Sequence, residues 1–415
     1  EISECLVGSE MCIRDSFKMV HKSFEVADEA DGVLNAVLQE NLSGVRVVRA
    51  FGQQEREVEK FDRVNNDLRK KNLRLNELLA IYWGGGDAIS MTQTLLTLVV
   101  CIIYACNGWI TVGTLIVFTS TLGMLLFPIR QLGRTLSDAG KAMVSMKRVQ
   151  AILHEEAEPD EPNALKPDLH GDIVFDHVSF AYPDDNVPVL RDVSFTIPAG
   201  KTAAVLGGTG SGKSTLVQLL LSFRLPTEGQ ILFDGVQASR IDRGVIRKNI
   251  SCVLQKTAVY SGTIRHNIEM GRPGAEETDI LEAADIAQLT PFLNSLPEHL
   301  EHPLQQSGKN LSGGQKQRLC IARAILKDAP IYVFDDSFSA LDFLTEANLR
   351  RSLNEKIQGK TQIVITQRIT SAMNADHIFV MDRGRLVDHG VHAELLSRCK
   401  IYQEIYASQT GGDAK

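Results

Sequence analysis

One long stretch of the 415-residue sequence lacks charge: no Asp, Glu, Lys or Arg occurs between Asp87 and Arg130. Asn107-Gly108, a typical turn signal, divides this stretch into two apolar segments. Each segment approaches the roughly 20 apolar residues that a helix needs to cross a bilayer. We therefore predict two membrane spans joined by a short loop; the alternative is a buried helical hairpin in a large soluble protein.

Positive charge is not in excess over the whole chain, but it gathers on both sides of this stretch. The 44 Lys and Arg against 51 Asp and Glu give a net charge of -7, which leaves no basic face for nucleic acid. Basic residues near both ends of a membrane segment place those ends in the cytoplasm. They are Arg69, Lys70, Lys71 and Arg74 before the stretch, and Arg130, Arg134, Lys141, Lys147 and Arg148 after it.

The seven cysteines have no metal-ligand spacing. Cys101 and Cys106 lie in the uncharged stretch, where we expect them to pack as small apolar side chains. Cys252, Cys320 and Cys399 fall in the soluble part of the chain and are expected to be reduced thiols in the cytosol. The sequence therefore predicts no metal site built on cysteine.

The N-terminus has neither the basic start nor the apolar run of a secretory signal peptide. Residues 6–16 read LVGSEMCIRDS, which matches the translation of a common transposon sequencing adaptor. Our hypothesis is that residues 1–16 are a library artefact and that the natural chain continues upstream with further membrane helices. A genuine N-terminal tail is the alternative, and an open reading frame that keeps this stretch in long reads would support it.

Residues 17–150 are predicted to form part of a helical membrane domain, because apolar residues recur there at helical spacing. The segment 44–52 interrupts this pattern. Gly84-Gly85-Gly86 should loosen the helix before the first span and Pro128 should kink the second, either as hinges or as close-packing sites. Asp87, at the edge of the uncharged stretch, is either a transport-path residue or a solvated structural one.

Residues 151–170 are acidic and contain prolines, so they are predicted to be a linker. From residue 171 to residue 415, strand-like and helix-like patterns alternate. The predicted fold class is an all-α membrane region followed by an α/β phosphate-loop domain. Short apolar runs typical of parallel strands buried on both faces occur at Ala203–Leu206, Ile331–Phe334, Gln362–Ile365 and Ile378–Met381.

A glycine-rich loop lies between the strand Ala203–Leu206 and the helix-like segment Thr215–Phe223. Its pattern lets backbone N–H groups surround phosphates, while the helix N-terminus adds partial positive charge. We expect Lys213 to reach the β- and γ-phosphates of ATP and Ser214 to ligate Mg²⁺; a plain turn is the alternative, which the flanking elements disfavour. The predicted ATP-binding residues of this loop are Gly207, Gly208, Thr209, Gly210, Ser211, Gly212, Lys213, Ser214 and Thr215.

Two residues outside the loop are predicted to complete the nucleotide site. Asp335 follows the strand Ile331–Phe334, and a carboxylate there suits the Mg²⁺ sphere of a phosphate-loop enzyme. Tyr182 precedes the loop and can stack on adenine, an interaction worth about 1–3 kcal/mol by analogy with base stacking. A tyrosine of the apolar core is the alternative for Tyr182.

A second anion-binding motif follows far along the chain. After Leu311, the residues Ser312, Gly313, Gly314 and Gln315 open an amphipathic helix, whose N-terminus favours another phosphate. One chain then carries two phosphate-binding surfaces that are distant in sequence. We therefore predict a head-to-tail dimer in which ATP lies between the glycine-rich loop of one subunit and this motif of the other.

In their order, these motifs resemble those of ATP-binding cassette (ABC) exporters, and from about Phe17 to its end the chain resembles an exporter half-transporter. The resemblance implies that the segment 44–52 docks on the cassette, although its apolar residues could equally be bundle core. It implies that Gln255 senses the γ-phosphate and joins the Mg²⁺ ligands, and that Ser339–Asp342 passes across the dimer. It further implies a cell (plasma) membrane protein with a cytoplasmic cassette and a small amphipathic or lipid-like substrate.

Two residues depart from the pattern of this family. The residue after the Mg²⁺ aspartate is usually Glu, which orients the attacking water, but here it is Asp336. Asp is one methylene shorter, and a misplacement near 1 Å can reduce a rate roughly 10²-fold. Gln367 stands where His is expected, and its neutral amide can bond the γ-phosphate without an imidazolium charge. Both changes in one site predict weak hydrolysis.

Because its second motif is intact, the chain resembles the degenerate member of a heterodimeric exporter. The expected partner is a second half-transporter with Glu and His at the positions of Asp336 and Gln367. The alternatives are a homodimer that hydrolyses ATP slowly with Asp336, and an ATP-binding regulator that does not transport. Soluble cassette proteins of DNA repair or translation are disfavoured by the uncharged stretch.

Overall fold

The computed structural model describes residues 2–155, 158, 163–183 and 187–410. The chain divides into two compact units, residues 1–157 and residues 158–415. The described part of the first unit is helical, and the second unit combines sheets with helices. This order confirms the predicted fold class, an all-α region followed by an α/β domain.

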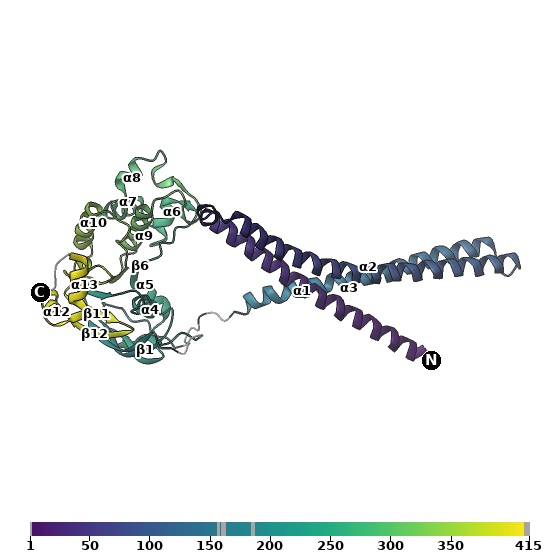
Figure 1. Cartoon of the computed structure of the whole chain (residues 1–415), viewed down its shortest axis with the longest axis horizontal. Coiled ribbons are helices and arrows are strands. Elements are labelled where there is room, and N and C mark those ends of the chain that lie inside the picture. The colour runs from purple at the N-terminus through teal and green to yellow at the C-terminus, as the bar shows by residue number, and fades with distance from the viewer. Residues whose placement is uncertain (1, 156–157, 159–162, 184–186, 411–415) are drawn as a thin grey trace. The chain divides into compact units, whose positions relative to one another are not determined.

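Three long helices form the first unit (Figure 1). The chain reverses direction at Gly52, whose φ of 62° suits a residue without Cβ. After this turn the second helix lies beside the first, so that Ala27 packs with Leu75 and Leu79. The helices are α1 (Ile2–Ala50), α2 (Gln54–Cys106) and α3 (Val112–Leu153).

The uncharged stretch lies in α2 and α3. By length and composition, α2 can cross a membrane, and Val112–Pro128 at the start of α3 is a shorter apolar segment. The predicted turn separates them, since α2 ends at Cys106 and Asn107-Gly108 follows. Large apolar side chains in both segments face outward, as contact with lipid requires; Leu95 is 60% exposed and Phe127 is 68% exposed.

The predicted interruption at residues 44–52 is confirmed only at its end, and the glycines expected to loosen the helix at residues 84–86 leave it unbroken. α1 continues through Gly44, so that only residues 51–53 break the helix, and α2 continues through residues 84–86. Each glycine costs about 1 kcal/mol relative to alanine, a penalty that the helix-forming residues on both sides outweigh. Pro128 also lies inside α3 without ending it. No described atom lies within 4 Å of a Cβ built at residues 84–86, so within this unit they are not close-packing sites.

Two main sheets and one short two-stranded ladder form the described part of the second unit. The larger sheet has the order β12-β11-β3-β10-β9-β6 and is parallel except for the pair β11 and β12. Its four central strands are the four that the apolar runs predict. The smaller sheet, of order β2-β1-β4-β5, is antiparallel. The strands are β1 (Ile173–Phe180), β2 (Leu190–Ile197), β3 (Thr202–Gly207), β4 (Glu228–Phe233), β5 (Val236–Gln237), β6 (Ile250–Val253), β9 (Ile331–Asp335), β10 (Thr361–Thr366), β11 (His377–Asp382) and β12 (Arg385–Gly390).

Helices and short segments connect these strands. A small separate ladder pairs β7 (Gly262–Thr263) with β8 (Pro303–Leu304). Single 3₁₀ turns lie at Ala238–Arg240, His299–Glu301 and Gln306–Gly308. The α-helices are α4 (Lys213–Leu220), α5 (Arg243–Lys248), α6 (Ile264–Glu269), α7 (Glu277–Ile286), α8 (Thr290–Asn294), α9 (Gly313–Lys327), α10 (Phe343–Lys356), α11 (Ile369–Ala372), α12 (His392–Arg398) and α13 (Lys400–Thr410).

Apolar side chains cover both faces of the larger sheet, which explains its uninterrupted apolar strands. The two sheets share one core, in which the rings of Phe195 on β2 and Phe379 on β11 lie 4.6 Å apart. A second core joins Phe334 on β9 to helices α7, α9 and α10. Because β3, β9 and β10 are parallel, the segments that follow them emerge at one edge of the sheet, where parallel sheets bind ligands.

Candidate nucleotide-binding site

The glycine-rich loop lies between β3 and α4, as the sequence predicts. Gly212 precedes the first residue of α4 and has a φ of 97°. A Cβ there would lie 2.6 Å from Leu190 Cδ2, and a Cβ at Gly207 would lie 2.4 Å from the carbonyl oxygen of Met381. Both positions therefore require glycine, which brings the loop backbone close to its neighbours and turns it around the N-terminus of α4.

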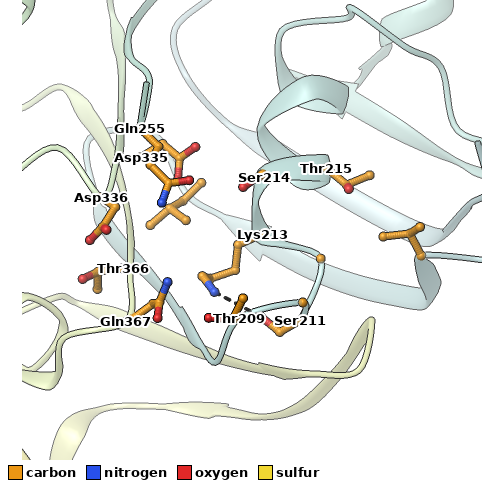
Figure 2. A pocket seen from close by; sticks show the side chains of 14 residues that line it. Thr209, Ser211, Lys213, Ser214, Thr215, Gln255, Asp335, Asp336, Thr366 and Gln367 are labelled. Carbon is orange, nitrogen blue, oxygen red and sulfur yellow. Dashed lines mark hydrogen bonds between the residues drawn. The ribbon is translucent and has the colours of Figure 1, made fainter. Parts of the chain in front are cut away.

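Lys213 folds back over the loop that it follows. Its Nζ donates hydrogen bonds to the carbonyl oxygens of Gly207 at 2.8 Å and Gly208 at 2.7 Å. It donates a further one to Ser211 Oγ at 3.2 Å (Figure 2). Burial lowers the pKa of the Lys213 ammonium, while the charges of Asp335 and Asp336 oppose this change. The ammonium is held by neutral oxygens that the charged oxygens of a phosphate would outcompete.

A cavity of about 220 Å³ opens in front of this loop. Figure 2 shows Lys213 on one side of it and the two aspartates with Gln255 and Gln367 on the other. The structure thus brings together residues from five separate segments of the chain. Of the predicted site residues, the cavity is lined by Thr209, Gly210, Ser211, Gly212, Lys213, Ser214, Thr215, Gln255, Asp335, Asp336 and Gln367.

The two adjacent aspartates are partly desolvated. Asp335 ends β9 and is 6% exposed; burial raises the pKa of its carboxyl, the charge of Asp336 raises it further, and Lys213 lowers it. Burial also raises the pKa of Asp336, against the charges of Arg368 and Lys213. A divalent cation would relieve this repulsion, and Ser214, Gln255 and Asp335 offer the oxygen ligands that Mg²⁺ prefers.

Asp336 has an unusual backbone conformation. Its φ is 45°, in the left-handed region that Asp tolerates better than most residues other than glycine. Its carbonyl oxygen accepts a hydrogen bond at 3.3 Å from Nε2 of Gln317, and Oε1 of Gln317 accepts one at 3.0 Å from Ala340 N–H. Gln317 lies on α9 and is only 3% exposed. It fixes the turn after β9, a role that the sequence pattern did not reveal.

Arg368 is a second residue that the sequence analysis missed. Its guanidinium donates to the carbonyl oxygen of Ser339 at 3.1 Å and lies 3.7 Å from a carboxylate oxygen of Glu346 on α10. The segment after β10 is thereby tied to the turn after β9. A basic residue directly after Gln367 was the available signal, because its charge reaches the neighbouring carboxylate of Asp336.

Tyr182 lies beside α4, outside the lining of the cavity. Its hydroxyl is 3.3 Å from Thr215 Oγ1 and 3.4 Å from Gln218 Oε1, and the guanidinium of Arg224 lies 5.0 Å from its ring centre. The ring is half-buried and packs on the core around Phe180. Its predicted contact with adenine remains a prediction.

Ser312, Gly313, Gly314 and Gln315 also lie outside this cavity. Ser312 caps α9: its Oγ accepts from Gln315 N–H at 3.3 Å, and Gln315 Oε1 accepts from Ser312 N–H at 2.8 Å. Ser312 is exposed, so the N-terminus of a 15-residue helix is open to solvent. The loop and this motif are separate surfaces of one chain, and the predicted binding of a phosphate at residues 312–315 stays a prediction.

Comparison with known proteins matches both units to parts of one family. Residues 190–339 match the ABC transporter model, and residues 16–129 match the ABC transporter transmembrane region. The chain is 35% identical to a probable multidrug resistance ABC transporter ATP-binding/permease protein of Bacillus subtilis, over 94% of this chain and 67% of that protein. It is 33% identical to an ATP-dependent lipid A-core flippase of Chromobacterium violaceum, over 91% of this chain and 64% of that protein.

The fold also matches a solved structure over its full length. A bacterial Atm1-family ABC exporter with ATP bound superposes with a TM-score of 0.90 at 27% identity, covering 100% of this chain and 73% of that chain. The chain spans about two thirds of the length of the relatives named above.

Proposed function

The chain belongs to the ABC transporter family, with a transmembrane region followed by an ATPase domain, and from this premise we propose that it is the degenerate-site subunit of a heterodimeric exporter. As a member of the exporter branch it is a membrane protein that couples ATP to export, with its ATPase domain in the cytoplasm. The proposed part of this function is that the chain's own nucleotide site binds ATP but hydrolyses it slowly.

The observation that carries the proposal is the pair Asp336 and Gln367 in the cavity of the glycine-rich loop. A base must come within about 2.6–3.2 Å of the water that it activates, and Asp reaches one methylene less far than Glu. Gln367 supplies a hydrogen bond but no positive charge to a developing phosphate anion. We expect this site to bind ATP through the loop and Lys213, and to hydrolyse it slowly.

Mg²⁺ fits the donor atoms that the cavity presents. Ser214, Gln255 and Asp335 would hold it, and when bound it would neutralise charge on the β- and γ-phosphates. Lys213 of this chain then binds the same phosphates as a point charge, and Asp336 orients water at the γ-phosphate less well than Glu would.

The partner in this proposal is a second half-transporter with Glu and His at the positions of Asp336 and Gln367. The exposed N-terminus of α9 supports it, because the first turn of that helix is open to a phosphate held by another subunit. Relatives named for multidrug resistance and for lipid A-core flipping support a small amphipathic or lipid-like substrate.

One experiment measures ATP hydrolysis by the purified full-length protein in lipid nanodiscs, first alone and then with its partner half-transporter. The proposal expects slow turnover alone and tight retention of ATP, with faster turnover in the pair. Rapid hydrolysis by the protein alone would instead support a homodimer that uses Asp336.

A second experiment restores the family residues with Asp336→Glu and Gln367→His together in the pair. Turnover should rise by about tenfold or more, because the base and the positive charge return to the γ-phosphate. An unchanged turnover, with ATP binding intact, would contradict the assignment of this site as degenerate.

A further inference from the structure

The segment that carries Gln367 is held from outside the nucleotide cavity. This switch segment, Gln367–Ile369, runs from the end of β10 to the first residue of α11. Gln409 on the C-terminal helix α13 donates from Nε2 to the carbonyl oxygen of Gln367 at 2.7 Å. Its Oε1 accepts from Ile369 N–H at 2.8 Å. One side-chain amide therefore brackets the segment, with one hydrogen bond on each side of Arg368.

These two bonds fix the direction in which the switch segment leaves the sheet. They engage the carbonyl of Gln367 and the first N–H of α11, backbone groups that have no strand partner beyond the end of β10 at Thr366. The side chain of Gln367 points into the cavity (Figure 2). A rotation of the Gln367 peptide would therefore move that amide relative to the γ-phosphate.

The helix that carries Gln409 rests on the core. Tyr402 on α13 is 0% exposed and packs with Leu395 and Cys399 in the cluster that contains Leu206 and Val380 of the sheet. Its hydroxyl lies 2.7 Å from His392 Nδ1. The core thus holds the C-terminal helix in place, and the side chain of Gln409 extends from this helix to the switch segment.

We propose that Gln409 is a positioning residue for ATP hydrolysis, which holds the backbone of the switch segment so that the residue at 367 faces the γ-phosphate. This inference rests on the proposed role of Gln367. It adds that the C-terminal helix, outside every nucleotide-binding motif of the chain, sets the geometry of the reaction. Gln409 acts through Gln367 and touches no nucleotide.

The test compares Gln409→Ala with a matched control, Gln403→Ala. Gln403 lies on the same helix, and its Nε2 also donates to a backbone carbonyl, that of Leu396 at 2.8 Å, away from the switch segment. Both variants are made in the full-length transporter, purified in nanodiscs with the subunit with which it assembles. Amide hydrogen exchange of residues 366–372 and steady-state hydrolysis of ATP with Mg²⁺ are measured on each.

Gln409→Ala should speed exchange at the Ile369 amide by about fivefold, because the loss of one hydrogen bond exposes it more often. Turnover should fall by about three- to tenfold in kcat, with KM for ATP unchanged, because the loop and Lys213 are untouched. Gln403→Ala should alter neither quantity. Gln409→Glu keeps the acceptor for Ile369 N–H and loses the donor to Gln367, so its exchange should resemble wild type while kcat still changes.

Equal exchange and equal kcat in Gln409→Ala and Gln403→Ala would overturn the inference. Faster exchange of the Ile369 amide with an unchanged kcat would support the two hydrogen bonds made by Gln409. It would contradict the role of Gln367 in the proposed function. A change in KM equal to the change in kcat would also overturn the inference, since it would mean that the nucleotide-binding loop itself had moved.

Discussion

Asp335, Asp336 and Lys213 share a cavity in which every charge is partly removed from water. Burial raises the pKa of both carboxyls and lowers that of the ammonium. A carboxyl whose pKa is higher in the folded state than in the unfolded state destabilises the fold at neutral pH. That penalty fades as the pH falls from the raised pKa toward the ordinary value of a carboxyl. The nucleotide-binding site therefore lowers the stability of the fold until phosphate and a cation balance its charges.

Asp335→Asn should raise the melting temperature of the nucleotide-free ATPase domain at neutral pH, because it removes the most buried of these charges. Wild type should gain stability as the pH is lowered through the raised pKa of Asp335 toward the ordinary value of a carboxyl, about 4, and the variant should gain less. ATP with Mg²⁺ should stabilise wild type strongly and the variant weakly, because a predicted cation ligand is lost. Thermal unfolding with and without nucleotide measures all three, and a variant less stable than wild type without nucleotide would contradict the charge argument.

Gln317→Leu tests the amide that fixes the turn after β9. The change removes both hydrogen bonds to the turn, so kcat should fall about tenfold while KM for ATP stays within about twofold. Thr361→Val is the matched control: Thr361 is also buried and makes two backbone hydrogen bonds, to Gly171 and Gly200, at the opposite end of β10. Both variants should lose about 1–3 kcal/mol of stability. Equal turnover in the two would show that Gln317 is structural only.

At the level of elements, the sequence predicted those features whose cause is local. The four parallel strands followed from apolar runs, and the loop between β3 and α4 followed from its glycines. Gly44 made the predicted interruption begin too early, because a single glycine carries a small penalty that the rest of a long helix outweighs. Gln317 and Gln409 could not be found this way, since each acts on backbone that lies far from it in sequence.

The turn between β4 and β5 anchors the start of the ATPase domain. The carboxylate of Asp234 accepts from three backbone N–H groups, those of His170 at 2.6 Å, Gly171 at 3.4 Å and Asp172 at 2.9 Å. Asp234→Ala leaves these donors without their acceptor and should lower the free energy of unfolding by about 2 kcal/mol. Urea unfolding of the ATPase domain measures it, and a loss below about 0.5 kcal/mol would mean that water replaces the carboxylate.

At the scale of the molecule, the two units suit different surroundings, lipid for the first and water for the second. The second unit has its own continuous cores, and every residue that lines the nucleotide cavity lies within it, between Val189 and Gln367. The first unit exposes large apolar side chains along α2 and α3. ATP binding therefore depends on the second unit, whereas membrane attachment depends on the first.

Residues 158–415, expressed alone, should be soluble and should bind ATP with a dissociation constant within a few-fold of the full-length protein. The full-length protein should stay in the membrane pellet after carbonate extraction, because the apolar segments of α2 and α3 need lipid. Size-exclusion chromatography, nucleotide titration and fractionation measure these outcomes. Aggregation of residues 158–415 on expression would show that the domain needs the helical unit in order to fold.

The left-handed backbone at Asp336 has a consequence for the history of this chain. Asp and Glu differ by one codon position, so reversion to the longer acid is always within reach of a single mutation. The conformation at this residue favours the shorter acid, however, so Glu at position 336 would meet a less favourable backbone. Under the proposed function, the main chain itself would then oppose a return to a self-sufficient site.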